Sequence, residues 1–157
     1  MTDTETLESK IFKFQFNVRI ANSTQNVWAL MTQDVNSWWM QDFRALGTDS
    51  SMSLALEPGG SLLESNDSGG SLEWYKVQMV VPGESLYLVG YLAPDWGGPT
   101  VSMLKLSLEA DGEGCVLTVA DALLGNVTDA RASTIEDGWK LMFGDGFKIY
   151  AESEHCQ

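Results

Sequence analysis

The clearest pattern in the chain is a strict alternation of apolar and polar residues in the segment IFKFQFNVRI, residues 11–20. Every second residue from Phe12 to Ile20 is apolar, and polar residues such as Lys13 and Arg19 lie between them. Successive side chains of a β-strand point to opposite faces, so this period predicts a strand with one buried face.

The next segment changes to helical spacing. Residues 22–24, Asn-Ser-Thr, are good N-cap residues, and Val27 and Met31 follow at a spacing of one helical turn, which predicts a short helix over residues 24–33. Residues 34–43, DVNSWWMQDF, are too aromatic for a solvated loop and too irregular for a long helix. We therefore expect a second short helix or turn there that directs tryptophan inward.

Six further segments have the composition and alternation of strands. They are separated by clusters of Gly, Pro, Asn and Asp, which favour turns. With the first strand they predict about seven strands, and the short connections favour an antiparallel meander. The predicted segments are residues 51–57, 61–64, 72–81, 85–92, 101–110 and 115–122.

The end of the chain, from about residue 128 to 153, returns to helical spacing. Ile135 and Trp139 belong to an apolar stripe, and charged residues occupy the other positions, so a long amphipathic helix is predicted. Gly144 and Gly146 lie inside it, and each lowers helix stability by roughly 1 kcal/mol relative to Ala. They indicate either close packing against the sheet or a point where the helix can flex.

These elements together predict an α+β fold of the helix-grip kind. About seven strands form a curved antiparallel sheet wrapped around a long C-terminal helix, and two short helices follow the first strand. The long helix is the only predicted element able to cover the apolar face of the sheet. A strongly twisted sheet cannot follow a straight helix along its whole length, so a cavity is expected between them. No internal repeat or linker is evident, which predicts one domain over residues 1–157, ordered from about 11 to 153.

Composition and charge narrow the classes of partner. Hydrophobic residues make up 44% of the chain and charged residues 20%, as in ordinary globular proteins. Nine Lys and Arg against 22 Asp and Glu give a net charge of −13, which repels phosphate backbones and argues against nucleic acid as a partner. The acidic surface serves solubility or docks a basic partner, and a homodimer is left open. The polar start of the chain and the lack of a long apolar stretch argue against a signal peptide and membrane insertion, so we expect a cytoplasmic protein.

The sequence lacks the residue sets of common catalytic and metal sites. His155, near the C-terminus, is the only histidine, and Cys115 and Cys156 are far apart in the sequence. A His-dependent nucleophile, a zinc site and a redox pair are therefore not expected. The Gly-Gly pairs lack the spacing of phosphate-binding loops and indicate turns. We expect no catalytic set, no metal and no cofactor, and a binding protein is favoured over an enzyme.

Several short motifs, taken in order, resemble the SRPBCC superfamily, and within it most of all the group named after the activator of the heat-shock chaperone ATPase. The resemblance covers residues 12 to 152, and its motifs are mostly structural. They are NSTxxVWALMT in the first helix, Trp38-Trp39, Pro58-Gly59-Gly60, PGESL at residues 82–86, Gly138-Trp139 and FKIYAE at residues 147–152.

The resemblance implies the helix-grip fold of the START domains and birch-pollen allergens, built around a pocket for apolar or amphipathic small molecules. Members of the superfamily include lipid carriers, polyketide cyclases, aromatases, hormone receptors and chaperone activators, so it does not imply one function. Many relatives carry a histidine near the end of the last strand, where this chain has Asp121. Any role of that histidine is therefore in doubt here.

The candidate ligand-binding residues come from the more apolar face of each strand, which we take as the inward face. On that basis Leu56 and Met79 also point inward. Each inward residue either faces a cavity or fills the core. The candidate set is Trp39, Leu54, Tyr75, Val77, Leu88, Leu106, Leu117, Asp121, Trp139, Met142 and Phe143.

Tyr75 and Asp121 are the polar members of this inward set and would orient a ligand. A buried Asp121 could have a raised pKa and act as an acid or base, but the alternative is a strand-end carboxylate that caps a neighbouring turn. The leading hypothesis is a domain that binds a hydrophobic or amphipathic small molecule. The alternatives are a polyketide cyclase-like enzyme that uses Asp121 and Tyr75, and a chaperone-ATPase activator or other protein-interaction module.

Overall fold

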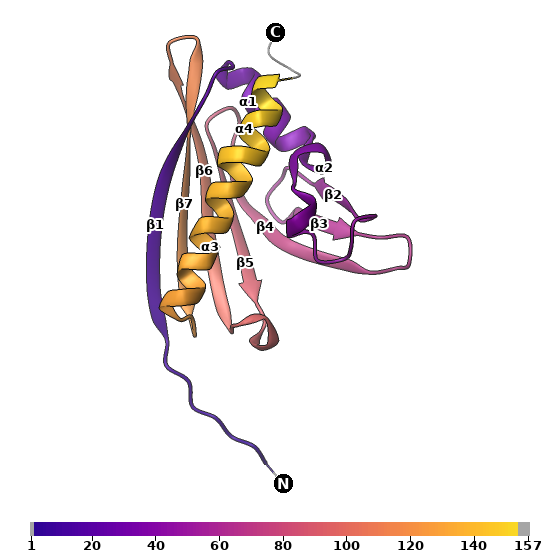
Figure 1. The fold of residues 1–157 in the computed structure, drawn as a ribbon, viewed down its shortest axis with the longest axis vertical. Coiled ribbons are helices and arrows are strands. Elements are labelled where there is room, and N and C mark those ends of the chain that lie inside the picture. The colour runs from indigo at the N-terminus through magenta and orange to yellow at the C-terminus, as the bar shows by residue number, and fades with distance from the viewer. Residues whose placement is uncertain (1, 154–157) are drawn as a thin grey trace.

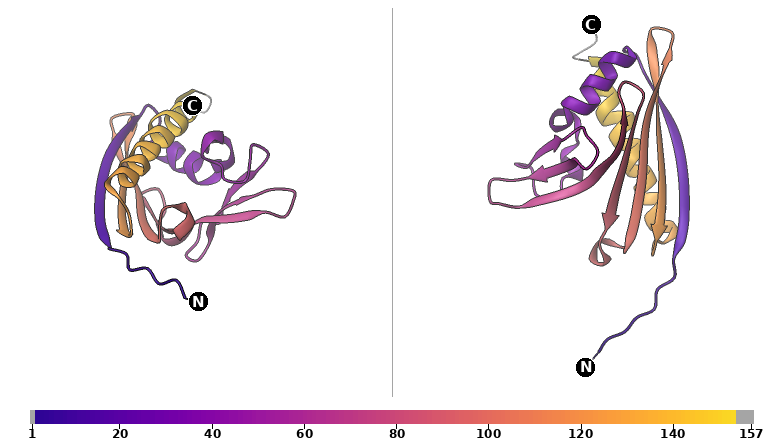
Figure 2. Two further views of the ribbon diagram at one scale, coloured as in Figure 1. Left: turned by 60° about the horizontal axis from the view of Figure 1, so that its bottom comes forward. Right: turned by 180° about the vertical axis from the view of Figure 1, so that it is seen from behind.

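A seven-stranded antiparallel sheet forms the body of the protein, seen here in a computed structural model that describes residues 2–153. The strand order is β1-β7-β6-β5-β4-β3-β2, so only the first strand lies beside a partner distant in sequence. Figures 1 and 2 show that the sheet curves, with β2 to β4 bending round toward the helices. The strands are β1 (Lys10–Ile20), β2 (Ser51–Leu54), β3 (Ser61–Ser65), β4 (Ser71–Val81), β5 (Ser85–Leu92), β6 (Thr100–Asp111) and β7 (Gly114–Gly125).

The C-terminal helix crosses the concave face of the sheet (Figure 1). Thr128 caps its start, because the side-chain oxygen accepts a hydrogen bond from the backbone N–H of Arg131. Its parts are α3 (Asp129–Leu141), the π-helical turn η3 (Met142–Phe147) and α4 (Lys148–Ser153). The short helical segments elsewhere are α1 (Thr24–Gln33), α2 (Val35–Trp38), η1 (Gln41–Phe43) and η2 (Pro94–Trp96). The predicted fold class is therefore confirmed.

The two glycines of the C-terminal helix have different surroundings. A Cβ atom at Gly146 would lie 2.8 Å from Cγ of Met40, so close packing explains this glycine, although the neighbour is the loop after α2 and not the sheet. A Cβ atom at Gly144 would meet nothing within 4 Å. Both glycines lie in η3, the π-helical turn, where backbone hydrogen bonds join residues five apart instead of four.

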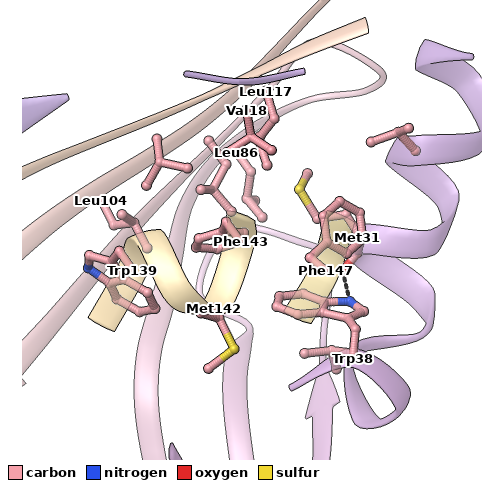
Figure 3. Packing of buried hydrophobic residues seen from close by; sticks show 14 of the residues in the cluster. Val18, Met31, Trp38, Leu86, Leu104, Leu117, Trp139, Met142, Phe143 and Phe147 are labelled. Atoms are coloured by element: carbon pink, nitrogen blue, oxygen red, sulfur yellow. Dashed lines mark hydrogen bonds between the residues drawn. The ribbon is translucent and has the colours of Figure 1, made fainter. Parts of the chain in front are cut away.

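The end of the interior near α1 and α2 is packed solidly. Figure 3 shows Phe143 and Phe147 of η3 between the sheet and Trp38. The ring of Trp38 lies edge-on to Phe147 at 5.0 Å between centroids, and its indole N–H donates to the carbonyl of Met31. A void of only about 20 Å³ remains between this packing and the strands.

Two bulges interrupt the pairing of β4, and one of them explains why the predicted inward face of this strand is partly wrong. The β4–β5 register passes from Val77 paired with Leu88 to Met79 paired with Tyr87, so one extra residue lies in β4. Beyond the bulge the alternation reverses, and Met79 is 44% exposed. The second bulge lies between β3 and β4 and affects the site described below.

Strand β2 is also shorter than predicted. It ends at Leu54, and the chain then turns, with the N–H of Ala55 bonded to the carbonyl of Ser61 and the N–H of Glu57 to that of Ala55. Leu56 is in this turn and is exposed, so its predicted inward position was wrong.

Within residues 2–153 no helix has the length and apolar character needed to cross a membrane. His155 and Cys156 lie outside the described residues.

Candidate functional site

A cavity of about 280 Å³ lies between the sheet and α3, at the end of the interior opposite the solid packing. Strands β4 to β7 form one wall, and α3 with the start of η3 forms another. Its apolar lining includes Leu92, Leu123, Ile135 and Met142, and Gly138 leaves space where a side chain would stand. Its aromatic lining is Trp39, Phe43, Trp74, Tyr75, Tyr91 and Trp139, and its polar lining is Ser102, Arg131 and Thr134.

Backbone irregularity in β4 places two adjacent aromatic residues in this cavity. The β3–β4 register passes from Leu62 paired with Tyr75 to Leu63 paired with Glu73, which leaves Trp74 as the extra residue of a bulge. Neighbouring residues of a regular strand point to opposite faces, but a bulge redirects one of them. Trp74 and Tyr75 therefore both line the cavity.

Gly90 of β5 makes room for the ring of Tyr75. A Cβ atom at Gly90 would lie 2.8 Å from Cε1 of that ring and 2.5 Å from the carbonyl oxygen of Trp74. Any side chain there would force the ring or the backbone to move. This glycine inside a strand thus marks a close approach.

Polar side chains from three strands and the helix form one hydrogen-bonded chain beside the cavity. The Tyr75 hydroxyl lies 2.6 Å from Oγ of Ser102, which donates to Oδ1 of Asp121 at 2.8 Å. The indole N–H of Trp139 donates to Oδ2 of Asp121 at 3.0 Å. Tyr75, Ser102 and Asp121 are all buried, and we call this set, with Trp139, the Asp121 relay.

When the Asp121 carboxylate is ionised, the direction of each hydrogen bond in the Asp121 relay is fixed. Ser102 has one hydroxyl hydrogen, and it is used on Asp121. The hydrogen between the two hydroxyls must then come from Tyr75. The phenol oxygen therefore offers only lone pairs to a ligand in the cavity.

Burial controls the acidity of this group of residues. Burial raises the pKa of Asp121 above its usual range, and the hydrogen bonds from Ser102, Trp139 and the N–H of Ala122 offset the effect only in part. Burial and the nearby Asp121 charge also raise the pKa of the Tyr75 phenol, and the bond to Ser102 opposes them. Tyr75 is therefore protonated at neutral pH.

A second buried carboxylate, Glu64 of β3, holds Trp74 in place. It accepts hydrogen bonds from the backbone N–H groups of Ala45 and Leu46 at 2.9 and 2.8 Å and from the Ser50 hydroxyl at 2.7 Å. It also accepts from the indole N–H of Trp74 at 3.0 Å. Burial raises the pKa of Glu64, but these four donors more than offset it, so its pKa is lowered.

Three indoles, those of Trp39, Trp74 and Trp139, form a continuous aromatic wall. The ring centroids of Trp39 and Trp74 are 5.4 Å apart, and those of Trp39 and Trp139 are 6.2 Å apart. The N–H groups of Trp74 and Trp139 are each held by a buried carboxylate. The ring positions are thus fixed from outside the cavity, and the ring surfaces remain available for an apolar ligand.

The structure distributes the predicted ligand-binding residues over three environments. Trp39, Tyr75, Trp139 and Met142 line the cavity. Asp121 stands behind Ser102 and Trp139 as the end of the relay. Leu54, Leu88, Leu106 and Phe143 surround the 20 Å³ void, and Val77 and Leu117 line neither space and are buried in the core.

The interpretation of Asp121 as a strand-end cap was wrong. Asp121 lies inside β7, paired with Phe14 on one side and Leu104 on the other. Its side chain accepts from Ser102 and Trp139 and caps no turn.

Cys115 on the same strand is also buried, and burial raises the pKa of its thiol. Within residues 2–153, no three His, Cys, Asp or Glu side chains gather as a metal site requires.

Sequence reasoning missed several residues of the site, among them Ser102, Trp74, Arg131 and Gly138. The alternation of β6 could have found Ser102, because it has the same parity as the inward Leu104. No local signal identifies Trp74, since the bulge that redirects it depends on pairing with β3. Arg131 and Gly138 become part of the site only through the position of α3.

Comparison with solved structures shows the same fold in several proteins at low identity. A Rhizobium leguminosarum protein of uncharacterised role matches with a TM-score of 0.72 and 13% identity over 96% of this chain and 100% of its own. CalU16 from Micromonospora echinospora matches with a TM-score of 0.62 and 16% identity over 96% of this chain and 88% of its own. DynU16, from the dynemicin biosynthetic locus, matches with a TM-score of 0.67 and 19% identity over 92% of this chain and 48% of its own. No protein-family model matches the sequence, and no curated protein matches it.

Proposed function

We propose that this protein is a ligand-binding domain that holds a small aromatic or otherwise apolar molecule between the sheet and α3. The observation that carries the proposal is a cavity of about 280 Å³ whose wall is mostly aromatic and aliphatic, with one buried hydroxyl pair at its inner side. Binding sites for small molecules combine such apolar walls with a few fixed polar groups. The volume is at the low end for such sites and suits two or three fused rings.

Membership of the SRPBCC superfamily is part of this proposal. The shared fold of CalU16, DynU16 and the Rhizobium protein supports it, together with the order of the sequence motifs. The finer likeness to the heat-shock chaperone activator group stays a prediction from those motifs. One domain and a cytoplasmic location likewise stay predictions from sequence.

The proposal is tested by recovering the ligand from cells. The purified protein is incubated with cell extract and analysed by native and denaturing mass spectrometry. We expect a bound small molecule in the native spectrum that is released on denaturation. A matched variant, Gly138→Leu, fills the cavity, because a Cβ atom at this position meets only the ring of Phe43 at 3.4 Å.

The filled variant should stay folded, since replacing a helical glycine favours the helix by up to about 1 kcal/mol. It should recover no ligand. Gly144→Leu is the control, because a Cβ atom there meets nothing within 4 Å and the position does not line the cavity. Recovery of no ligand by the unmodified protein, or of equal amounts by the unmodified protein and Gly138→Leu, would contradict the proposal.

A second candidate, a cyclase-like enzyme, is favoured by the Asp121 relay. A buried carboxylate with a raised pKa, joined through Ser102 to a phenol, can accept and return a proton without exposure to water. DynU16 comes from a biosynthetic locus, which agrees with such chemistry. Incubation with linear poly-β-ketone thioesters should give a cyclised product that Asp121→Asn does not form, and the absence of product from the unmodified protein would eliminate this candidate.

A further inference from the structure

The inner side of the cavity presents a hydrogen-bond acceptor. Tyr75 is 6% exposed, and among the side chains that the structure describes its hydroxyl has a hydrogen bond to Ser102 alone. When Asp121 is ionised, Ser102 donates to it, and the Tyr75 hydrogen is used on Ser102. A ligand hydroxyl that reaches Tyr75 must therefore donate its own hydrogen to the phenol oxygen.

The outer side presents a hydrogen-bond donor, Arg131 in the first turn of α3. The guanidinium Nη2 donates to the carbonyl oxygen of Trp96 at 2.8 Å, and no described carboxylate forms an ion pair with it. In a chain with 22 acidic and nine basic residues, an arginine without an acidic partner at a cavity mouth is notable. A guanidinium has five N–H donors, so most remain available.

Space for this arginine is provided by the η2 turn. A Cβ atom at Gly97 would lie 2.4 Å from Nη2 of Arg131, and Gly97 also has a φ of +93°, which favours glycine. The guanidinium is therefore seated against the turn and has a defined position. Arg131 lines both the main cavity and a second space of about 440 Å³ outside it, so it stands where the two meet.

The two acidic residues that line the outer space, Glu73 and Asp95, form no ion pair with Arg131. Glu73 also lines that space, but its carboxylate is bonded to the Ser61 hydroxyl and lies 3.3 Å from Nζ of Lys76. Asp95 lines the space without an ion pair to Arg131. The exposed rings of Tyr91 and Trp96 extend the aromatic surface outward past the arginine.

From this geometry we infer the chemical class of the ligand: a flat aromatic carboxylic acid that carries a hydroxyl at the opposite end. The inference rests on the proposed function and adds to it the polar groups at the two ends of the ligand. The aromatic body lies among the indoles of Trp39, Trp74 and Trp139. The hydroxyl donates to Tyr75, and the carboxylate accepts from Arg131, in the paired geometry that guanidinium groups form with carboxylates.

Three naphthalene probes and two variants test the inference by isothermal titration calorimetry. The probes are 6-hydroxy-2-naphthoic acid, 2-naphthoic acid without the hydroxyl, and 2-naphthol without the carboxylate. Arg131→Gln should lower the affinity for both acids about tenfold and leave the affinity for 2-naphthol unchanged. Tyr75→Phe should lower the affinity for the two hydroxyl-bearing probes about fivefold and leave the affinity for 2-naphthoic acid unchanged.

Matched controls separate these effects from changes in net charge or folding. Arg19→Gln removes an arginine that pairs with Asp111 on β6, and Tyr87→Phe removes a hydroxyl from a ring that packs under Lys105. Neither position lines the cavity, so neither variant should change the affinity of any probe. Circular dichroism confirms that each variant is folded.

The outcomes distinguish this inference from the proposed function. If 2-naphthol binds and each variant weakens all three probes equally, or none of them, the assigned polarity is overturned and the apolar binding function stands. Binding of no probe overturns the inference too, and the mass-spectrometric comparison with Gly138→Leu then decides the proposed function separately.

Discussion

Two buried carboxylates hold two indole groups of the same cavity, and their acidities shift in opposite directions. Glu64 fixes Trp74 and has a lowered pKa, whereas Asp121 fixes Trp139 and has a raised pKa. Both are almost fully shielded from solvent, with exposures of 0% and 3%. The exposed fractions of the two side chains therefore do not explain the difference.

Asp121 lies deeper in the interior, so burial raises its pKa more strongly, and the two carboxylates also differ in the donors that they receive. Glu64 has four, and two of them are backbone N–H groups of the loop after η1. Asp121 has three, from Ser102, Trp139 and the backbone N–H of Ala122, so only one of them is a backbone group. Glu64 is thus built for stability, and Asp121 is held in a form less favourable for folding, as groups beside functional sites commonly are.

The largest effect is expected from removing the stabilising carboxylate. Glu64→Ala leaves the N–H groups of Ala45 and Leu46 and the indole of Trp74 without their acceptor. We expect the free energy of unfolding to fall by about 3–5 kcal/mol, measured by urea denaturation. Glu73→Ala, one strand away on an exposed carboxylate, should change it little. Equal losses in the two variants would contradict the structural role of Glu64.

A smaller loss is expected from Gly90→Ala, which disturbs the seat of Tyr75. The new Cβ would lie 2.5 Å from the Trp74 carbonyl oxygen, so the backbone must move and displace the ring of Tyr75. We expect a loss of about 2–3 kcal/mol in urea denaturation, together with weaker probe binding. Gly144→Ala is the control and should be neutral or stabilising. Unchanged stability of Gly90→Ala would show that Tyr75 is not seated against this strand.

Ser102→Ala cuts the relay in the middle. Tyr75 loses its acceptor and Asp121 loses one donor. The expected loss of stability is about 1–2 kcal/mol, again by urea denaturation. Ser107→Ala, on the opposite face of β6, serves as control and should cost less. A loss no larger than that of the control would mean that the relay is not formed.

Asp121→Asn is expected to have the smallest effect on stability of these four changes, and its effect depends on pH. An amide can accept from Trp139 and donate to Ser102, so the site stays bonded. Because the folded pKa of Asp121 is raised, its contribution to the free energy of unfolding decreases as pH rises from about 4 through the folded pKa. Asn lacks this decrease.

Urea denaturation of both proteins across about pH 4 to 8 measures this difference. The variant should gain stability relative to the unmodified protein as pH rises. Glu64 acts in the opposite sense, since its lowered pKa adds stability that is lost as pH falls, but it is common to both proteins and cancels. A difference that does not change with pH would contradict the raised pKa of Asp121.

Most of the fold could be predicted from the sequence, and the site only in part. Alternation located the buried face of β1 correctly because this strand pairs with β7 without a break in register. It failed at Met79 and missed Trp74 because bulges shift the phase of β4, and a bulge depends on the partner strand. Glu64 has the same inward parity as Leu62, but its donors come from a loop that only the folded chain brings near.

A crystal structure of the protein with 6-hydroxy-2-naphthoic acid tests the central claim most directly. We expect electron density for the rings between Trp39 and Trp139, with the hydroxyl oxygen at Tyr75 and the carboxylate at Arg131. Side chains that close the cavity, with no density between the sheet and α3, would contradict it.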